Sequence, residues 1–261
     1  VPTADQIADK EIPEDGQYVA TTEDFTVLGS RGKPELVNFW NKNVGLPPSA
    51  VVSNMLRLPE DDLLANLLGG ASPKELGLRG ISYSLRSGVN IKTLGPLTKA
   101  FDGDVAQSFY LRPDKSLFIG AVSKYPTAGA AITSNSNIAV MNRILQNAAT
   151  LADDADMGSL SMVASDVDTS YVMAKAGFLP TQSAWLRLRR ALKKQAALTV
   201  TSASAKEAIA AALANESPAG LTALAQLPAG KQLLGAASWS GSLNMQDPGS
   251  VSVRKQYLKM A

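Results

Sequence analysis

The feature of this sequence that most constrains its fold is a long amphipathic run that begins after the polar residues 134–137 (SNSN). Apolar side chains recur there at the three- and four-residue spacing of one helix face, and the preceding Ser and Asn side chains are good N-caps. The apolar face consists of Ile138, Met141, Ile144, Leu145, Ala148 and Leu151. The pattern predicts a helix that buries one face, and the neighbouring segments must supply the core that covers it.

Apolar, β-prone runs lie on both sides of this helix. Residues 105–113 (VAQSFYLRP) and 116–123 (SLFIGAVS) are separated by a turn-forming Pro-Asp-Lys sequence, so we expect an antiparallel hairpin. Residues 159–165 (SLSMVAS) are typical of another buried strand, and residues 166–176 of a short helix that ends at Gly177. This order of elements predicts an α/β fold.

Three further segments have assignable periodicity. Residues 80–86 (GISYSLR) alternate like a strand, whereas residues 89–101 are predicted to form a helix with a weak point at Gly95-Pro96. The alternation in residues 183–190 (SAWLRLRR) predicts a last strand.

We expect three parts along the chain. Residues 1–79 form a loop-rich N-terminal extension that packs on the core and contains a short helix beginning at Pro59, which has acids in its first turn and Gly at its end. Residues 80–190 form the central domain. Residues 191–261 form an Ala-rich helical C-terminal extension, with helices near Ser204 and over 220–227.

Composition excludes several kinds of chemistry. The chain has no Cys and no His, so disulfides, thiolate nucleophiles, zinc ribbons and imidazole acid–base catalysis are ruled out, and we predict no metal site. A formal charge of +2 is far from the basic excess typical of nucleic-acid-binding proteins, which makes nucleic acid an unlikely partner.

The sequence contains no run of apolar residues long enough to span a bilayer and no signal-peptide pattern, so we expect a soluble protein without membrane contact. Its compartment is not indicated. The chain begins with Val1 rather than Met, which leaves open that it is a processed piece or a domain of something longer.

The arrangement from Ser116 to Phe178 resembles the GNAT superfamily of N-acyltransferases, in which a central strand leads into a phosphate-holding loop, a long helix, another strand and a short helix ending in Gly-Phe. The phrase MAKAGF (173–178) occupies the position of the family's YEKLGF-like phrase. The resemblance covers about a quarter of the chain and implies a GNAT-like, mixed but mostly antiparallel sheet flanked by helices. It also implies acetyl-CoA as the cofactor.

The resemblance places the cofactor on a strand and on the loop after it. The family's loop has the pattern Q/R-x-x-G-x-G/A, and PTAGAA (126–131) matches it except that Pro126 replaces the leading Gln or Arg. A helix N-terminus is a natural seat for a pyrophosphate, because its amides are unpaired and its dipole is positive there. The implied cofactor-binding residues are Ala121, Val122, Ser123, Gly129, Ala130, Ala131, Thr133 and Ser134. Residues 118–123 should splay from residues 160–164 to pair with the pantetheine arm.

The catalytic groups implied by the resemblance are only partly present. Family members often place a Glu on or near the central strand and a Tyr on the last helix, but residues 116–123 contain no carboxylate and Met173 occupies the Tyr slot. Tyr171 and Asp166 are therefore the catalytic candidates. Asp168 and Tyr125, which lies beside the loop, are further candidates.

Two charged clusters have plainer interpretations. The basic residues Arg187, Arg189, Arg190, Lys193 and Lys194 could hold an adenosine 3′-phosphate or a nucleic-acid backbone, but alternation favours a strand with one solvated face. The acids Asp153, Asp154 and Asp156 are interpreted as a polar helix end rather than a metal cluster.

Two functions from different classes follow. The first is an acyl-CoA-dependent N-acyltransferase that acts on a small-molecule or protein amine. The second is a non-catalytic GNAT-like structural or interaction module of a larger assembly, such as a virion or secretion-related protein, with a protein partner bound through the terminal extensions. A third reading, an ADP-ribosyltransferase-like toxin, rests on residues 79–82 (RGIS) and 133–136 (TSNS) but lacks the family's Glu-x-Glu pair.

Overall fold

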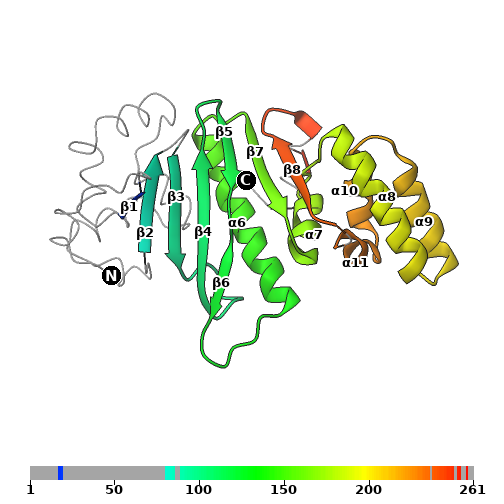
Figure 1. Ribbon diagram of the computed structural model, residues 1–261, viewed down its shortest axis with the longest axis horizontal. Helices are drawn as coiled ribbons and strands as arrows, with labels where there is room; N and C mark the ends of the chain where they lie inside the picture. The colour runs from blue at the N-terminus through cyan, green and yellow to red at the C-terminus, as the bar shows by residue number, and fades with distance from the viewer. Residues whose placement is uncertain are drawn as a thin grey trace. The chain divides into compact units, whose positions relative to one another are not determined.

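The computed structural model describes residues 17–19, 80–85, 89–235, 237–249, 252–253 and 257 (Figure 1). The predicted helix at Pro59 and most of the predicted N-terminal extension lie outside these residues. Backbone contacts group the described chain into two compact units, which we call unit 1 and unit 2. Unit 1 extends to Thr133 and includes Arg143–Gly158, and unit 2 comprises Ser134–Asn142 and the described residues from Ser159 onward.

Unit 1 is built on an antiparallel sheet. Neighbouring strands pair in the order of the chain through β1 (Gln17–Val19), β2 (Gly80–Leu85), β3 (Val89–Gly95) and β4 (Gly103–Leu111). The other edge of β4 pairs with two short strands, β5 (Ser116–Ile119) and β6 (Ser123–Pro126). Strand β4 is therefore the centre of this sheet, and Figure 1 shows it as the longest arrow.

A β-bulge separates β5 from β6. Phe109 pairs with Ile119 and Ala106 pairs with Ser123, so two residues of β4 face three residues, 120–122, of the other strand. The amide of Gly120 still donates to the carbonyl of Ser108 at 2.8 Å. The extra residue bends the strand and changes which side chains point inward on its two halves.

Helix α6 (Ser134–Asp154) supplies its first turns to unit 2 and the rest to unit 1. In unit 1 its buried residues Ile144, Leu145, Ala148 and Leu151 form a core with Val105, Phe109, Leu111, Leu117 and Ile119. Each of these larger side chains is at most 2% exposed, and burial of one Leu or Ile contributes about 2 kcal/mol. The amphipathic pattern of the sequence therefore marks the face on which this core is built.

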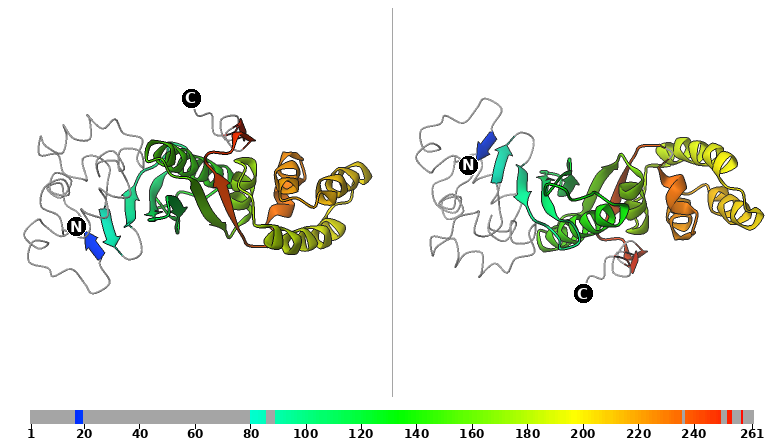
Figure 2. Two further views of the ribbon diagram at one scale, coloured as in Figure 1. Left: turned by 90° about the horizontal axis from the view of Figure 1, so that it is seen from above. Right: turned by 90° about the horizontal axis from the view of Figure 1, so that it is seen from below.

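Unit 2 combines a strand pair with helices. Strand β7 (Ser159–Ala164) pairs antiparallel with β8 (Trp239–Asn244), and Leu179 bridges to Ser242 on the other edge of β8. Between these strands the chain forms α7 (Val167–Lys175), α8 (Gln182–Thr199), α9 (Ala203–Ala214), α10 (Ala219–Gln226) and α11 (Gly230–Leu234). Figure 2 shows α8 and α9, joined by the short connection 200–202, next to each other.

The structure confirms the α/β class and most of the predicted elements. The hairpin, the amphipathic helix, the strand after it and the short helix ending at Gly177 correspond to β4–β5, α6, β7 and α7. Strand β2 and helices α9 and α10 also match their predictions. Whether the arrangement is specifically that of a GNAT domain stays a prediction, as do the three expected parts of the chain.

Three segments differ from the predictions. The predicted helix 89–101 is wrong, because Val89–Gly95 is strand β3, and its alternation of Val89, Asn90, Ile91 and Lys92 was the overlooked signal. The predicted last strand 183–190 is wrong, because it lies within helix α8. Strand β8 was not predicted, and it lies in the segment that we expected to be helical.

The error in α8 has a clear physical cause. Its buried side chains are Trp185, Leu188, Leu192 and Ala196, which recur at helical spacing. The alternation of the sequence depends on Leu186, whose side chain is 41% exposed.

Among the described helices, none combines the length and apolarity that a bilayer crossing requires.

Gly103, the first residue of β4, gives a test of this packing. It has φ of +148°, and a Cβ at this position would lie 2.7 Å from the Cα of Pro126 and closer still to the carbonyl oxygen of Tyr125. We expect Gly103→Ala to lower the free energy of unfolding by about 3 kcal/mol in urea denaturation.

Gly129→Ala is the matched control, because Gly129 also has positive φ (+88°) but has open space around its missing Cβ. It should cost only about 1 kcal/mol, from backbone strain alone. Equal losses for the two variants would contradict the close approach of β6 to Gly103.

Candidate functional site

The candidate site is organised by two acids at the start of α7. Asp166 is the N-cap of this helix, and its carboxylate accepts hydrogen bonds from the amide of Thr169 (2.9 Å) and from its hydroxyl (2.7 Å). Asp168 lies in the first turn, where a carboxylate complements the helix dipole, and it is only 5% exposed. The cap therefore directs the first turn so that Asp168, not Asp166, is buried.

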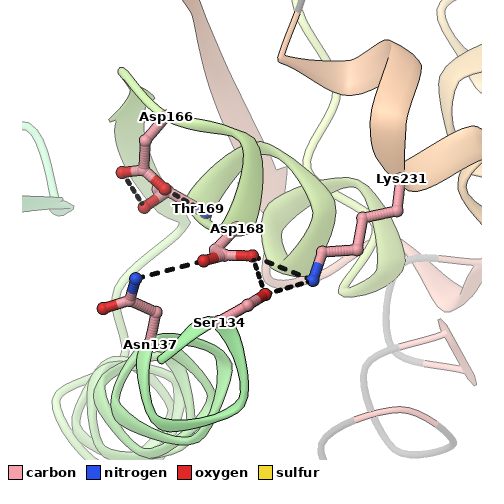
Figure 3. A network of polar contacts seen from close by, with 6 residues as sticks. All are labelled: Ser134, Asn137, Asp166, Asp168, Thr169 and Lys231. Atoms are coloured by element: carbon pink, nitrogen blue, oxygen red, sulfur yellow. Dashed lines mark hydrogen bonds and ion pairs between the residues drawn. The ribbon is translucent and has the colours of Figure 1, made fainter. Parts of the chain in front are cut away.

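Asp168 joins three elements of unit 2 through its carboxylate (Figure 3). It accepts hydrogen bonds from the hydroxyl of Ser134 (2.6 Å) and the side-chain amide of Asn137 (3.1 Å), both in the first turn of α6. Lys231 of α11 lies 2.9 Å away as an ion pair and also donates to the hydroxyl of Ser134. A buried carboxylate is thus paired with one cation and two neutral donors, as burial of a charge requires.

These contacts determine the charge state of Asp168. Burial opposes ionisation of the carboxyl, but the hydrogen bonds from Ser134, Lys231 and Asn137, together with the positive charge of Lys231, more than offset this effect. The pKa of Asp168 therefore lies below its usual value. A carboxylate with a low pKa is a weak proton acceptor at neutral pH, which disfavours Asp168 as a general base.

Aromatic and cationic side chains surround this group. The ammonium groups of Lys175 and Lys231 lie 5.5 and 5.7 Å from the ring centre of Tyr171, within the range of cation–π attraction. Lys175 also lies 5.9 Å from the ring centre of Tyr257 and donates to the side-chain carbonyl of Gln226. The two lysines are thereby placed around Tyr171.

Tyr257 belongs to the same neighbourhood. Burial raises the pKa of its hydroxyl, a hydrogen bond with Asn142 opposes the rise, and Tyr171 adds to it. A phenol with a raised pKa stays protonated over the physiological range, so Tyr257 is available as a hydrogen-bond donor rather than as a base.

The predicted catalytic residues lie near this group but have other contacts. Asp166 is occupied by the capping bonds to Thr169, and Figure 3 shows these bonds apart from the network around Asp168. Tyr171 is half-buried, and the ammonium groups of both lysines lie near its ring. Met173, in the family's Tyr slot, is fully buried. The catalytic roles of Tyr171 and Asp166 stay predictions.

Three predicted cofactor residues lie at the bulge and the start of β6. Ala121 and Ser123 are exposed and Val122 is half-buried, and Ser123 pairs with Ala106 of β4. Strands β5 and β6 belong to unit 1 and β7 belongs to unit 2, so the predicted splaying of residues 118–123 from residues 160–164 stays a prediction.

The predicted phosphate loop is exposed and partly tied to its own backbone. The amide of Ala130 donates to the carbonyl of Thr127 (2.8 Å), and Thr127 is held by two hydrogen bonds to Asp102. Gly129 and Ala131 are exposed, as is Thr133 at the loop end. The amide of Ala130 therefore does not point outward as a donor to phosphate, which weakens the expected cradle.

Ser134 is the predicted residue that the structure brings into the cluster. Ser134 contacts Asp168, considered in the sequence as an acid–base group, and Lys231, and Asp168 also accepts a hydrogen bond from Asn137; Lys231 and Asn137 were not predicted. Asn137 was visible only as part of the N-cap sequence. Lys231 carried no signal, because it lies 97 residues from Ser134 in the chain.

The described residues form no candidate metal cluster, and the pocket in unit 1 is lined by none of the residues of the network around Asp168. Across residues that the structure describes, no group of three or more acids is placed to hold a metal ion. An open pocket of about 760 Å³ in unit 1 is lined by residues of the β3–β4 connection and by Arg143, and it includes none of the predicted site residues.

Comparison with known proteins adds no assignment. No protein-family model matches the chain, and searches of curated proteins and of solved structures find no match either. The resemblance to the GNAT superfamily therefore stays a prediction that rests on the order of elements alone.

Substitution of Asp168 by Asn tests the network. The change leaves Lys231, which is only 31% exposed, without its counter-charge, so we expect a loss of about 2 kcal/mol in the free energy of unfolding at pH 7. Because the folded pKa of Asp168 is depressed, its stabilisation is complete above the unfolded pKa of about 4 and is lost as the pH falls through the lower folded value.

The difference between the wild type and Asp168→Asn should therefore shrink below pH of about 4, which urea denaturation over a pH series measures. Asp166→Asn is the control, since Asn caps a helix as well as Asp does, and it should change stability by less than about 0.5 kcal/mol. A difference for Asp168→Asn that stays constant at acidic pH would rule out the ion pair as its cause.

Proposed function

We propose that this chain is a non-catalytic GNAT-like interaction module, a domain of that architecture that serves as a scaffold in a larger assembly such as a virion or a secretion-related structure. The observation that carries this proposal is the contact of Asp168, in α7, with Ser134 and Asn137 in the first turn of α6. The order of elements, the contacts of Asp168 and the candidate catalytic side chains support it in turn.

The order of elements supports the architectural part. A hairpin strand bent by a bulge is followed by an exposed loop, a long helix, a strand and a short helix, in β5–β6, α6, β7 and α7. Helix α7 is followed by Gly177, with φ of +88°, and by the fully buried Phe178. This is the order on which the resemblance to the superfamily rests.

The contacts of Asp168 support the non-catalytic part. A helix N-terminus attracts an anion, and in this protein the carboxylate of Asp168 takes hydrogen bonds from Ser134 and Asn137 in the first turn of α6. A pyrophosphate near these donors would lie beside an ionised carboxylate and would be repelled by it. The protein's own side chain therefore competes with an anionic cofactor for this helix start.

The state of the candidate catalytic side chains also supports a non-catalytic role. Acyl transfer to an amine needs a group that accepts a proton and a group that reprotonates the thiolate. Asp166 is engaged as a helix cap, and the depressed pKa of Asp168 makes it a poor base. Met173 occupies the place where the family has a Tyr.

Isothermal titration calorimetry with coenzyme A and with acetyl-CoA tests the proposal. We expect no measurable heat of binding at about millimolar cofactor, which corresponds to a binding free energy weaker than about −4 kcal/mol. Analytical ultracentrifugation of the same sample should show a stable oligomer, or a defined complex with a partner that co-purifies. Binding of acetyl-CoA in the micromolar range would overturn the proposal.

An acyl-CoA-dependent N-acyltransferase that transfers an acetyl group from acetyl-CoA to a small-molecule or protein amine is the second candidate. The loop at Gly129 favours it, because this residue adopts positive φ and open space surrounds its Cα, so a ligand can approach the backbone closely. This candidate requires release of free coenzyme A when acetyl-CoA and a mixture of amines are supplied. It also requires that Tyr171→Phe or Asp166→Asn slow that release, and unchanged rates in both variants would exclude these residues as its catalytic groups.

A further inference from the structure

Helix α8 carries the densest positive charge in the described part of the chain. Its 18 residues contain five cations, Arg187, Arg189, Arg190, Lys193 and Lys194, and no acid. No acidic residue occurs anywhere between Asp168 and Glu207. The whole chain has a formal charge of only +2, so the remainder of the chain is net negative. The positive charge is therefore concentrated on one helix rather than spread over the surface.

The helical geometry places these cations on the solvent side of α8. The buried stripe consists of Trp185, Leu188, Leu192 and Ala196. Four of the five cations are exposed and Arg189 is half-buried at the border of the stripe. Pairs four residues apart, Arg189 with Lys193 and Arg190 with Lys194, form two adjacent rows along the helix.

These side chains have no counter-charge in the described structure. None of the five side chains makes a hydrogen bond or ion pair with another described residue. A typical solvated helix face interleaves acids with bases, because pairs at i, i+4 add stability and like charges repel. A row of cations without acids lacks the stabilisation of i, i+4 ion pairs and keeps the repulsion between like charges. We therefore interpret it as a binding surface.

We propose that the exposed face of α8 binds the phosphate backbone of double-stranded nucleic acid. Residues 187–194 extend over about 10 Å of helix, and duplex DNA presents about six phosphate charges over the same length, which matches the five cations. Three of the five are Arg, whose planar guanidinium group binds phosphate oxygens in pairs. The exposed face of α8 has no aromatic side chain, the usual anchor of a protein interface.

The small net charge of the whole chain predicted that nucleic acid is an unlikely partner. It did so because it averages the five cations of α8 with the net-negative remainder of the chain. The predicted strand over residues 183–190 also assigned the cations to an ordinary alternating face. The inference does not depend on the proposed function, since α8 shares no residue with the network around Asp168.

Fluorescence anisotropy with a labelled random duplex of about 20 base pairs tests the inference on the full chain. We expect binding that weakens between about 50 and 200 mM salt, with a slope of log Kobs against log salt of about −4.5, from about −0.9 for each of the five cations. In the double variant Arg190→Gln/Lys194→Gln the slope should fall to about −3, with affinity reduced at least about tenfold at the lower salt concentration. Gln preserves helix propensity, so these exposed substitutions should leave the fold intact.

The matched control is Lys99→Gln/Lys115→Gln, which removes two positive charges outside α8 and should leave the slope near that of the wild type. A second variant, Leu186→Ser/Leu198→Ser, removes the two exposed apolar side chains of α8 and should bind the duplex as the wild type does. Equal losses in the two charge variants would show a general charge effect and overturn the inference. It would also be overturned by absence of duplex binding, or by binding of poly-glutamate or anionic vesicles in preference to the duplex.

Discussion

The ion pair and hydrogen bonds of Asp168 are the interaction on which the helical side of unit 2 depends. One carboxylate connects the first turn of α6, the first turn of α7 and the short helix α11. It is nearly buried, so each partner must stay in place for the charge to be tolerated. The same contacts keep the carboxylate ionised and thereby give α6 a negative partner at its positive end.

Under the proposed function, the order of elements and the capacity for acyl transfer depend on different residues. The scaffold depends on strand order and on the apolar face of α6, which are set by packing in the core. The ability to hold an anionic cofactor depends on a few donors at one helix end. In this chain Asp168 engages two donors at the start of α6, Ser134 and Asn137, so the proposed function makes one acidic residue in α7 responsible for the difference.

The α/β class and most of the described elements could be predicted from the sequence, whereas the network around Asp168 could not. The spacing of Met141, Ile144 and Leu145 predicts α6 because the buried face of a helix repeats along the chain. Sequence alternation failed in α8, where Leu186 is exposed and Trp185 buried, because a short segment fits both periods until the longer stripe is considered. The contact of Ser134 with Lys231 joins distant residues and follows no local pattern, so local reasoning could not find it.

The bulge between β5 and β6 determines which side chains of the second half-strand face inward. Lys124 pairs with Val105 on the buried face of β4, whereas Tyr125 pairs with Asp104 and is 56% exposed. Regular pairing with all three residues 120–122 kept would place Lys124 opposite Asp104 and turn its ammonium outward, so the bulge is what keeps Lys124 opposite Val105. Loss of one residue from 120–122 would therefore straighten the strand and leave Tyr125 on the exposed face beside the loop that follows β6, so the surface chemistry there survives a length change that the bulge absorbs.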